Sequence, residues 1–172
     1  MKYILVLYLA AVITAGYGAF TDLKSHKIYN KLTMPVIASG LLLNIILGGI
    51  HGLGDSLLGL FLGFSFLFLW LLGMLKAGDV KLYMAVGALA GWRFCGYTMI
   101  YSILLGGAAA LGLMVRRKSG CASLYRVKIY LSNLIYSRQF RRYEPEESSG
   151  YFSFGCCIFA GTLFAVWKLY FK

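Results

Sequence analysis

Acidic residues, prolines and paired cysteines are scarce in this chain of 172 residues. It has six Asp and Glu residues against 17 Lys and Arg residues, and its only prolines are Pro35 and Pro145. None of the four cysteines belongs to a Cys-x-x-Cys pair and no pair of histidines lies nearby, which argues against a zinc site and favours cysteines that simply pack. The scarcity of proline suits long helices. We expect neither a metal nor a cofactor.

Long apolar runs are what the chain has in abundance. Hydrophobic residues make up 60% of it, and its mean hydropathy is +0.74. A helix needs about 20 apolar residues to cross roughly 30 Å of hydrocarbon. Several such runs follow one another, separated by short polar breaks, and they leave no room for a separate soluble domain. We therefore predict an all-α, polytopic membrane protein with a single domain over residues 1–172.

Six membrane spans can be drawn on this pattern. The predicted spans are residues 3–20, 32–50, 53–75, 80–92, 97–115 and 151–170. The fourth is short and needs its neighbours or an oblique path to reach across the bilayer. The first follows only one positive side chain and has no small-residue cleavage pattern at its end. We expect it to be a retained helix rather than a cleaved signal peptide.

The distribution of basic residues orients these spans. The loops at 21–31, 76–81 and 116–150 would lie on one side of the membrane, and they hold 13 of the 17 Lys and Arg residues. An excess of Lys and Arg marks the cytoplasmic face, so the basic loops are predicted inside and both termini outside. The net charge of +11 is then mostly a topology signal. Because the charge is spread over short loops, a nucleic-acid partner explains it less well.

The long cytoplasmic loop at 116–150 has a pattern of its own. Apolar residues recur in it at helical spacing with basic residues between them, which predicts an amphipathic helix on the anionic inner surface of the membrane. A disordered basic linker is the alternative. The apolar positions are Leu124, Val127, Leu131, Leu134 and Ile135, and a solvated acidic run follows at Glu144, Glu146 and Glu147.

Three of the few carboxylates, Asp22, Asp55 and Asp79, lie at or near the ends of predicted spans. A carboxylate at the membrane boundary is costly unless it is hydrated, paired or functional. Asp22 and Asp79 fall on the same, basic side, and Asp55 on the opposite side. Two neighbouring carboxyl groups share one proton, so that one can take a proton from water while the other polarises a peptide carbonyl. The alternative is that each aspartate caps a helix or pairs with a lysine.

The segments around both aspartates point to a family. Residues 22–30 read Asp-Leu-Lys-Ser-His-Lys-Ile-Tyr-Asn, and residues 77–82 read Ala-Gly-Asp-Val-Lys-Leu. In these two segments, and in the last span, the chain resembles the type IV prepilin peptidases among the GxGD intramembrane aspartyl proteases. It departs from the family pattern twice: Tyr29 stands in place of a proline, and Lys76 in place of the first glycine of GxGD. Lys76 should put a cation near Asp79.

The resemblance implies an aspartic endopeptidase that cleaves the leader of prepilin-like precursors at the cytoplasmic face of the cell membrane. It implies Asp22 and Asp79 as catalytic residues, with Gly78 and Asn30 as candidate substrate-binding residues. Glycine directly before an aspartate lets a substrate backbone approach closely. The short, cysteine-free loop after the first span resembles the Flp/tad-type pilus form or a related archaellin-type peptidase. Peptidase activity without methyl transfer is therefore expected.

Two other functions compete with this hypothesis. One is a non-catalytic membrane component of a pilus or secretion assembly. The other is a small cation carrier, which is less favoured because carriers place charges near the middle of the bilayer. Several glycines in the predicted spans allow close approach of another helix, either that of a substrate or a helix of the protein itself. These glycines are Gly59, Gly63, Gly87 and Gly91.

Overall fold

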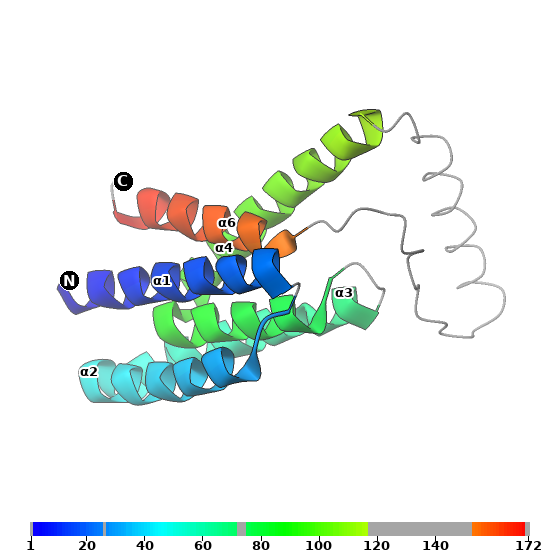
Figure 1. The fold of residues 1–172 in the computed structure, drawn as a ribbon. Helices are drawn as coiled ribbons and strands as arrows, with labels where there is room; N and C mark the ends of the chain where they lie inside the picture. Colours follow the sequence, from blue (N-terminus) through cyan, green and yellow to red (C-terminus); the bar gives the residue numbers. More distant parts are fainter. Residues whose placement is uncertain (1, 26, 72–74, 117–152, 171–172) are drawn as a thin grey trace, which may run out of the picture.

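The computed structural model describes residues 2–25, 27–71, 75–116 and 153–170. In this part the regular elements are all helices, which confirms the all-α prediction (Figure 1). They are α1 (Lys2–Ser25), α2 (Asn30–Ser65), α3 (Leu67–Leu71), α4 (Ala77–Arg116) and α6 (Phe154–Tyr170). The predicted amphipathic segment at 124–135 and the acidic run at 144–147 lie outside the described residues.

Two of these helices, α2 and α4, reverse direction at a glycine. Gly49 has φ 59° and ψ −146°, and Gly91 has φ 79° and ψ 175°, conformations that glycine adopts at little cost. The hydroxyls of Tyr83 and Ser102 share a hydrogen bond although they are 19 residues apart. In a straight helix they would be separated by about 28 Å, at 1.5 Å per residue. Helix α4 is therefore a helical hairpin, and Figure 1 shows the same reversal in α2; the two reverse at the ends of the predicted spans 32–50 and 80–92.

The helices are apolar enough for a membrane. Three helical stretches have the length and composition to cross one, namely Tyr3–Ser25 in α1, Asn30–Leu71 over α2 and α3, and Ala77–Gly112 in α4, and Phe154–Leu169 is a shorter apolar helix. Large hydrophobic side chains face outward, among them Ile46 at 74% exposure and Ile50 at 80%. Soluble proteins rarely expose such wide apolar surfaces. The bundle is thus built for lipid contact, while the count of six spans and their sidedness stay predictions.

Several element boundaries differ from the predicted spans. Helix α1 continues to Ser25, so Asp22 lies within its final turns instead of following it. The predicted span 53–75 corresponds to the second half of α2 and to α3, with a break at Phe66. Apolar content marks only the stretch that suits hydrocarbon, whereas helical hydrogen bonding continues into polar residues beyond it.

Glycines bring α2 and α4 into close contact. The backbones of Gly59 and Gly87 face each other, and a Cβ atom added at either would meet the carbonyl group of the other. A Cβ atom added at Gly63 would lie 2.6 Å from the backbone nitrogen of Met84. Internal packing is therefore confirmed as a role of these three glycines. Gly91, the fourth of the set, forms the reversal of α4.

Polar side chains of α2 donate hydrogen bonds to backbone carbonyls at the reversal of α4. The carbonyls of Ala88 and Leu89 lie just before Gly91, where the helical hydrogen-bond pattern is interrupted. The Asn44 amide donates to the Ala88 carbonyl at 3.1 Å and to the Leu89 carbonyl at 3.0 Å. The hydroxyl of Ser56 also donates to the Ala88 carbonyl. In an apolar surrounding such carbonyls need internal donors, and α2 supplies them.

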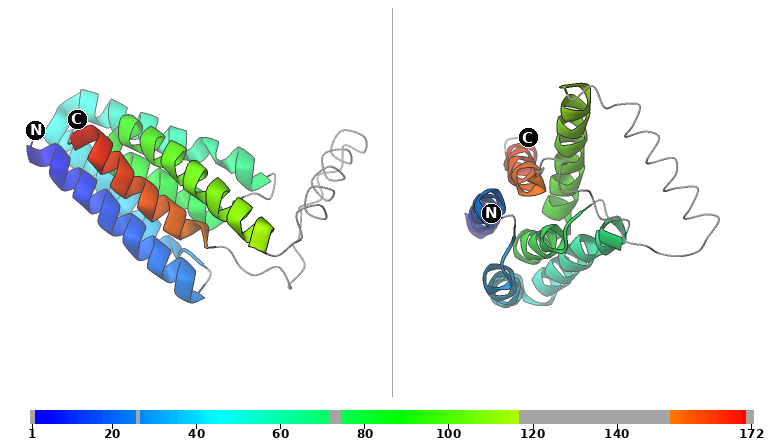
Figure 2. Two further views of the ribbon diagram at one scale, coloured as in Figure 1. Left: turned by 90° about the horizontal axis from the view of Figure 1, so that it is seen from above. Right: turned by 45° about the vertical axis from the view of Figure 1, so that its right-hand side comes forward.

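Helix α4 is the central element, because it contacts α1, α2, α3 and α6. Figure 2 shows its first half between α2 on one side and the neighbouring α1 and α6 on the other. At one end of the bundle α1 ends, and α2, α4 and α6 begin (Figure 1). This end therefore collects residues from four separate parts of the sequence.

Candidate active site

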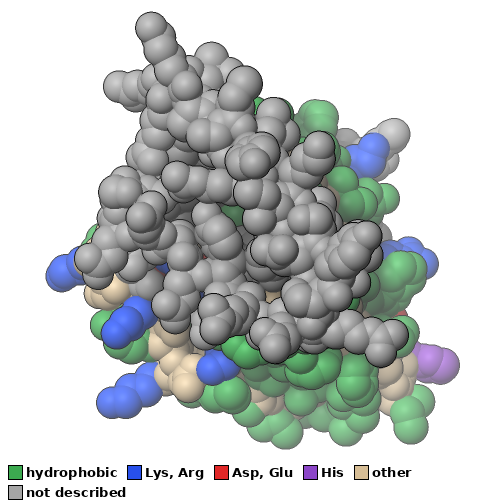
Figure 3. Space-filling model, turned by 90° about the vertical axis from the view of Figure 1, so that its right-hand side faces the viewer, with side chains coloured by type: hydrophobic (Ala, Val, Ile, Leu, Met, Phe, Trp, Pro, Cys, Tyr) green, Lys and Arg blue, Asp and Glu red, His purple; other side chains and the backbone are tan. Residues whose placement is uncertain are grey.

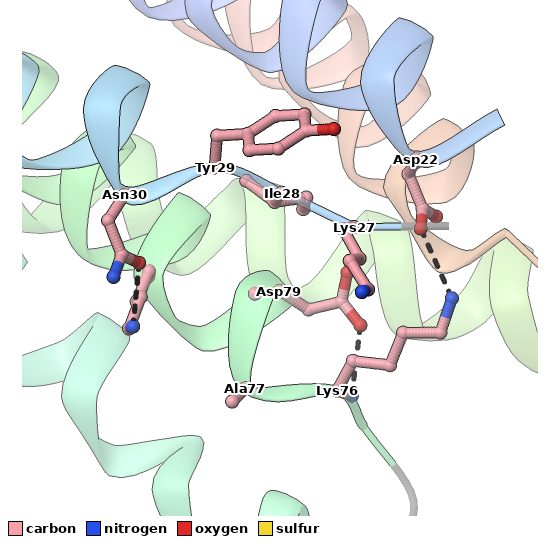
Figure 4. A pocket seen from close by; sticks show the side chains of 10 residues that line it. Asp22, Lys27, Ile28, Tyr29, Asn30, Lys76, Ala77 and Asp79 are labelled. Atoms are coloured by element: carbon pink, nitrogen blue, oxygen red, sulfur yellow. Dashed lines mark hydrogen bonds and ion pairs between the residues drawn. The ribbon is translucent and has the colours of Figure 1, made fainter. Parts of the chain in front are cut away.

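A pocket of about 360 Å³ lies at the end of the bundle where these four helices meet. Its walls come from the final turns of α1, from the connection between α1 and α2, and from the start of α4 (Figure 4). The view onto this end shows Lys and Arg side chains along part of its edge, beside hydrophobic side chains (Figure 3). The lining residues are Asp22, Lys27, Ile28, Tyr29, Asn30, Lys76, Ala77, Gly78, Asp79 and Lys81.

The two aspartates selected from the sequence both line this pocket. Asp22 comes from α1 and Asp79 from the first turn of α4, and each is only 1% exposed. Asp55 lies elsewhere, in a second pocket of about 240 Å³ next to the reversals of α2 and α4. The fold thus brings Asp22 and Asp79 to one site and keeps Asp55 apart. Their catalytic role stays a prediction.

Both carboxylate oxygens of Asp22 have partners. Oδ1 lies 3.1 Å from the Nζ atom of Lys76, in an ion pair. Oδ2 accepts a hydrogen bond of 3.2 Å from the backbone N–H of Gly155, in the first turn of α6. A cation and a helix N-terminus both favour negative charge at this position. Asp22 is therefore surrounded as an ionised carboxylate would be.

Asp79 has a poorer set of partners. Its Oδ2 atom accepts a hydrogen bond of 3.1 Å from the backbone N–H of Lys76. Its Oδ1 atom is buried and has no hydrogen-bond partner among the described residues. A buried carboxylate oxygen without a donor is costly in the charged form. The two aspartates of the pocket thus differ in their hydrogen-bond donors, of which Asp22 has two and Asp79 has one among the described residues.

Lys76 contacts both aspartates. The sequence predicted a cation near Asp79, and the charge of Lys76 does act on that carboxylate, but the ammonium group forms its ion pair with Asp22, and the backbone N–H of Lys76 bonds to Asp79. The reason is geometric, because the backbone just before α4 lies against Asp79 while the long side chain extends across to α1 (Figure 4). Sequence reasoning singled out Lys76 but missed this partner.

Gly155 was missed as a site residue. It stands at the start of the last predicted span, 133 residues from its partner Asp22. A Cβ atom added there would lie 3.1 Å from the Cβ atom of Asp22 and 3.2 Å from the Cα atom of Ala19. The signals were a glycine at the start of an apolar helix and the resemblance of the last span to the family, and neither by itself points to α1.

The two candidate substrate-binding residues line the pocket and also hold it together. A Cβ atom added at Gly78 would lie 3.0 Å from the Cβ atom of Ile28, so the glycine lets the connection between α1 and α2 pack on α4. The side-chain oxygen of Asn30 accepts a hydrogen bond of 2.7 Å from Nζ of Lys81. Contact of Gly78 or Asn30 with a substrate stays a prediction.

The described residues offer no metal-binding cluster, since no group of three or more His, Cys, Asp and Glu side chains among them could hold an ion. Two buried carboxyl groups that line one pocket can still act together. One can accept a proton from a water molecule while the other polarises a carbonyl group. This arrangement suits hydrolysis of an amide bond.

Comparison with known proteins agrees with these observations. The model of the type IV leader peptidase family matches residues 6–111. The chain is 34% identical over 106 residues to the prepilin leader peptidase/N-methyltransferase of Aeromonas hydrophila, covering 57% of this chain and 36% of that protein. It is 30% identical over 136 residues to the protein of that name from Aeromonas salmonicida strain A449, covering 66% and 46%. No solved structure gives a significant match.

These matches cover most of this chain but only part of each relative. The chain spans less than half the length of the curated relatives that it matches. The matched region 6–111 contains both aspartates and Lys76, while α6 with Gly155 lies beyond it. Because the family model covers more than half of the sequence, the chain belongs to the type IV leader peptidase family.

Proposed function

We propose that this chain is an aspartic endopeptidase that removes the leader of prepilin-like precursors at the cytoplasmic face of the cell membrane. Asp22 and Asp79 are the proposed catalytic pair. One observation carries the proposal: two aspartates from different helices, each 1% exposed, line the same pocket. Membership of the leader peptidase family supports the reaction, and the names of the relatives support the class of substrate.

In the proposed reaction a water molecule lies between the two carboxyl groups. The ionised aspartate takes a proton from this water, whose oxygen attacks the carbonyl carbon of the scissile peptide bond. The protonated aspartate donates a hydrogen bond and then its proton to the carbonyl oxygen. When the tetrahedral intermediate collapses, the C–N bond breaks and the leaving amine receives a proton from the pair. Neither a metal nor a covalent enzyme intermediate is required.

The substrate is proposed to approach along the membrane boundary. The pocket lies at an end of the bundle, where helices that suit hydrocarbon give way to polar connections. The apolar segment of a precursor would stay in the bilayer beside the helices, with its cleavage site at the pocket. Gly78 and Asn30, which line the pocket, would then contact the backbone of the substrate.

The short connection between α1 and α2 supports peptidase activity without methyl transfer. Ser25 ends α1 and Asn30 begins α2, so only residues 26–29 join the two helices. The relatives carry N-methyltransferase in their names and are more than twice as long as the part of them that matches. We propose peptidase activity without methyl transfer, as in the short Flp/tad-type form. The proposed orientation has this connection in the cytoplasm and both termini outside.

The test is co-expression with a candidate prepilin and detection of the loss of its leader as a change in size. The wild-type chain should process the precursor. Asp22→Asn and Asp79→Asn preserve the shape of each side chain and remove its acid–base function, so each should slow processing by about 100-fold or more. Asp55→Asn is the matched control, because it makes the same change in the other pocket.

The result separates the peptidase from a non-catalytic component. Processing that persists in both Asp22→Asn and Asp79→Asn would exclude the proposed mechanism. An Asp55→Asn variant as defective as the other two would show that the loss reflects a general effect of removing acidic residues. A membrane assembly component would keep its function in all three variants.

A further inference from the structure

We propose that Lys76 is a positioning residue that keeps Asp22 as the proton-accepting member of the pair and leaves Asp79 as the proton donor. This inference rests on the proposed peptidase function and assigns a role to each aspartate. It also gives a function to the lysine that stands where the family pattern has a glycine.

The two carboxyl groups differ in their hydrogen-bond donors. Asp22 receives an ammonium group at 3.1 Å on one oxygen and a backbone N–H at 3.2 Å on the other. Asp79 receives one backbone N–H, and its second oxygen is buried without a partner among the described residues. When one proton is shared between two buried carboxyl groups, it belongs on the group with fewer donors. That group is Asp79.

One residue, Lys76, contacts both aspartates. The backbone N–H of Lys76 bonds to Asp79, and its side chain extends from there to Asp22 (Figure 4). The Lys76 side chain is 38% exposed, whereas that of Asp22 is 1% exposed. The ammonium group therefore brings a compensating charge from the rim of the pocket to a carboxylate that water hardly reaches. It also fixes the start of α4 relative to α1.

The other two lysines of the pocket, Lys27 and Lys81, form no ion pair with Asp22 among the described residues. The ammonium group of Lys81 bonds to the side-chain oxygen of Asn30, the first residue of α2. Within the described part of the chain, the recorded ion pair of Asp22 is with Lys76 alone, and Lys27 lines the pocket without one. Removal of the Lys76 charge should therefore affect Asp22 directly.

The experiment measures kcat and KM for a prepilin precursor with the purified full-length chain in detergent or liposomes. Lys76→Met keeps the length of the side chain and removes its charge, and Lys76→Arg keeps the charge. Lys24→Met is the control, since Lys24 is an exposed residue two positions from Asp22 that does not line the pocket. Lys76→Met should lower kcat about tenfold with KM within about threefold, because misplaced catalytic groups slow the chemical step. Lys76→Arg and Lys24→Met should retain most of the wild-type kcat.

Three results would overturn the assignment while the proposed function stands. They are a Lys76→Met variant that is as fast as the wild type or faster, a loss confined to KM, and a Lys76→Arg variant as slow as Lys76→Met. A faster Lys76→Met would mean that the ammonium group obstructs the site. If Lys76→Met does not elute as a folded species, Lys76→Gln takes its place. A wild-type chain that cleaves no precursor would instead refute the proposed function, and this inference with it.

Discussion

The backbone N–H of Gly155 donates a hydrogen bond of 3.2 Å to the Oδ2 atom of Asp22, 133 residues earlier in the chain. Gly155 lies in the first turn of α6, so the positive end of that helix faces the carboxylate. The match to the family model ends at residue 111. A helix beyond the matched region thus completes the surroundings of one of the two candidate catalytic residues.

Replacement of Gly155 by alanine should impair processing. The added Cβ atom would lie 3.1 Å from the Cβ atom of Asp22 and 3.2 Å from its Oδ2 atom, so either α6 or Asp22 must shift. A shift of a few tenths of an ångström relieves contacts of this length, and a displacement of reacting groups by about 1 Å can cost on the order of 100-fold in rate. We therefore expect Gly155→Ala to slow precursor cleavage by about three- to tenfold, measured as kcat with the purified enzyme.

A matched control for this variant is Gly107→Ala. An added Cβ atom at Gly107 would meet no atom within 4 Å, and alanine favours a helix over glycine. Gly107→Ala should therefore be as active and as stable as the wild type. If Gly155→Ala cleaves the precursor at the wild-type rate, the contact between α6 and Asp22 is not part of the catalytic arrangement.

Asn44 should contribute to stability through the carbonyls at the reversal of α4. Its amide donates to the carbonyls of Ala88 and Leu89 and to that of Gly40 in its own helix. Asn44→Leu keeps a similar volume and leaves these acceptors with fewer donors, at a cost of about 1–3 kcal/mol. We expect a lower melting temperature in detergent, measured by intrinsic fluorescence.

Ser39→Ala provides the comparison for Asn44→Leu. The Ser39 hydroxyl bonds at 3.0 Å to the Val36 carbonyl within an exposed part of the same helix, so its loss should hardly change the melting temperature. Equal stability of the Asn44→Leu variant and the wild type would mean that Asn44 does not stabilise the carbonyls of Ala88 and Leu89.

The contact between Gly59 and Gly87 should tolerate no side chain. A Cβ atom on Gly87 would meet the backbone carbonyl of Gly59, and backbone cannot move aside as a flexible side chain can. Gly87→Ala should destabilise the protein by about 1–3 kcal/mol or more, the cost of overpacking. Gly112→Ala, on the same helix with open space at its Cβ position, should not. Melting temperatures and the yield of monodisperse protein in detergent distinguish the two, and equal values would refute the close contact.

Much of the fold could be predicted from the sequence because apolar runs and glycines have strong physical meanings. The runs indicated helices suited to a membrane, and the breaks near Gly49 and Gly91 fell at predicted span ends. That Asp22 and Asp79 line one pocket followed from placing both at the same end of the predicted spans. Each of these inferences depends only on residues that are close in sequence or on the order of the helices.

The contacts between helices could not be predicted in this way. The bonds of Asp22 with Lys76 and with Gly155 join residues 54 and 133 positions apart, and they depend on the rotation and depth of each helix. Periodicity does not fix these quantities when a helix is apolar on most of its surface. For the same reason Asn44 gave no sequence signal, although it supplies donors to the end of a neighbouring helical segment.

Sidedness of the membrane orientation can be tested with single cysteines in a chain whose own four cysteines are replaced. Lys31, at the start of α2, and His51, after the reversal of α2, are both exposed. The excess of basic residues around Lys31 predicts a cytoplasmic position, and His51 is predicted outside. In intact cells a membrane-impermeant maleimide should therefore label His51→Cys, whereas Lys31→Cys should react only after permeabilisation. Labelling in the reverse order would place the pocket, together with Asp22 and Asp79, on the outer face, and a cytoplasmic cleavage site would then be excluded.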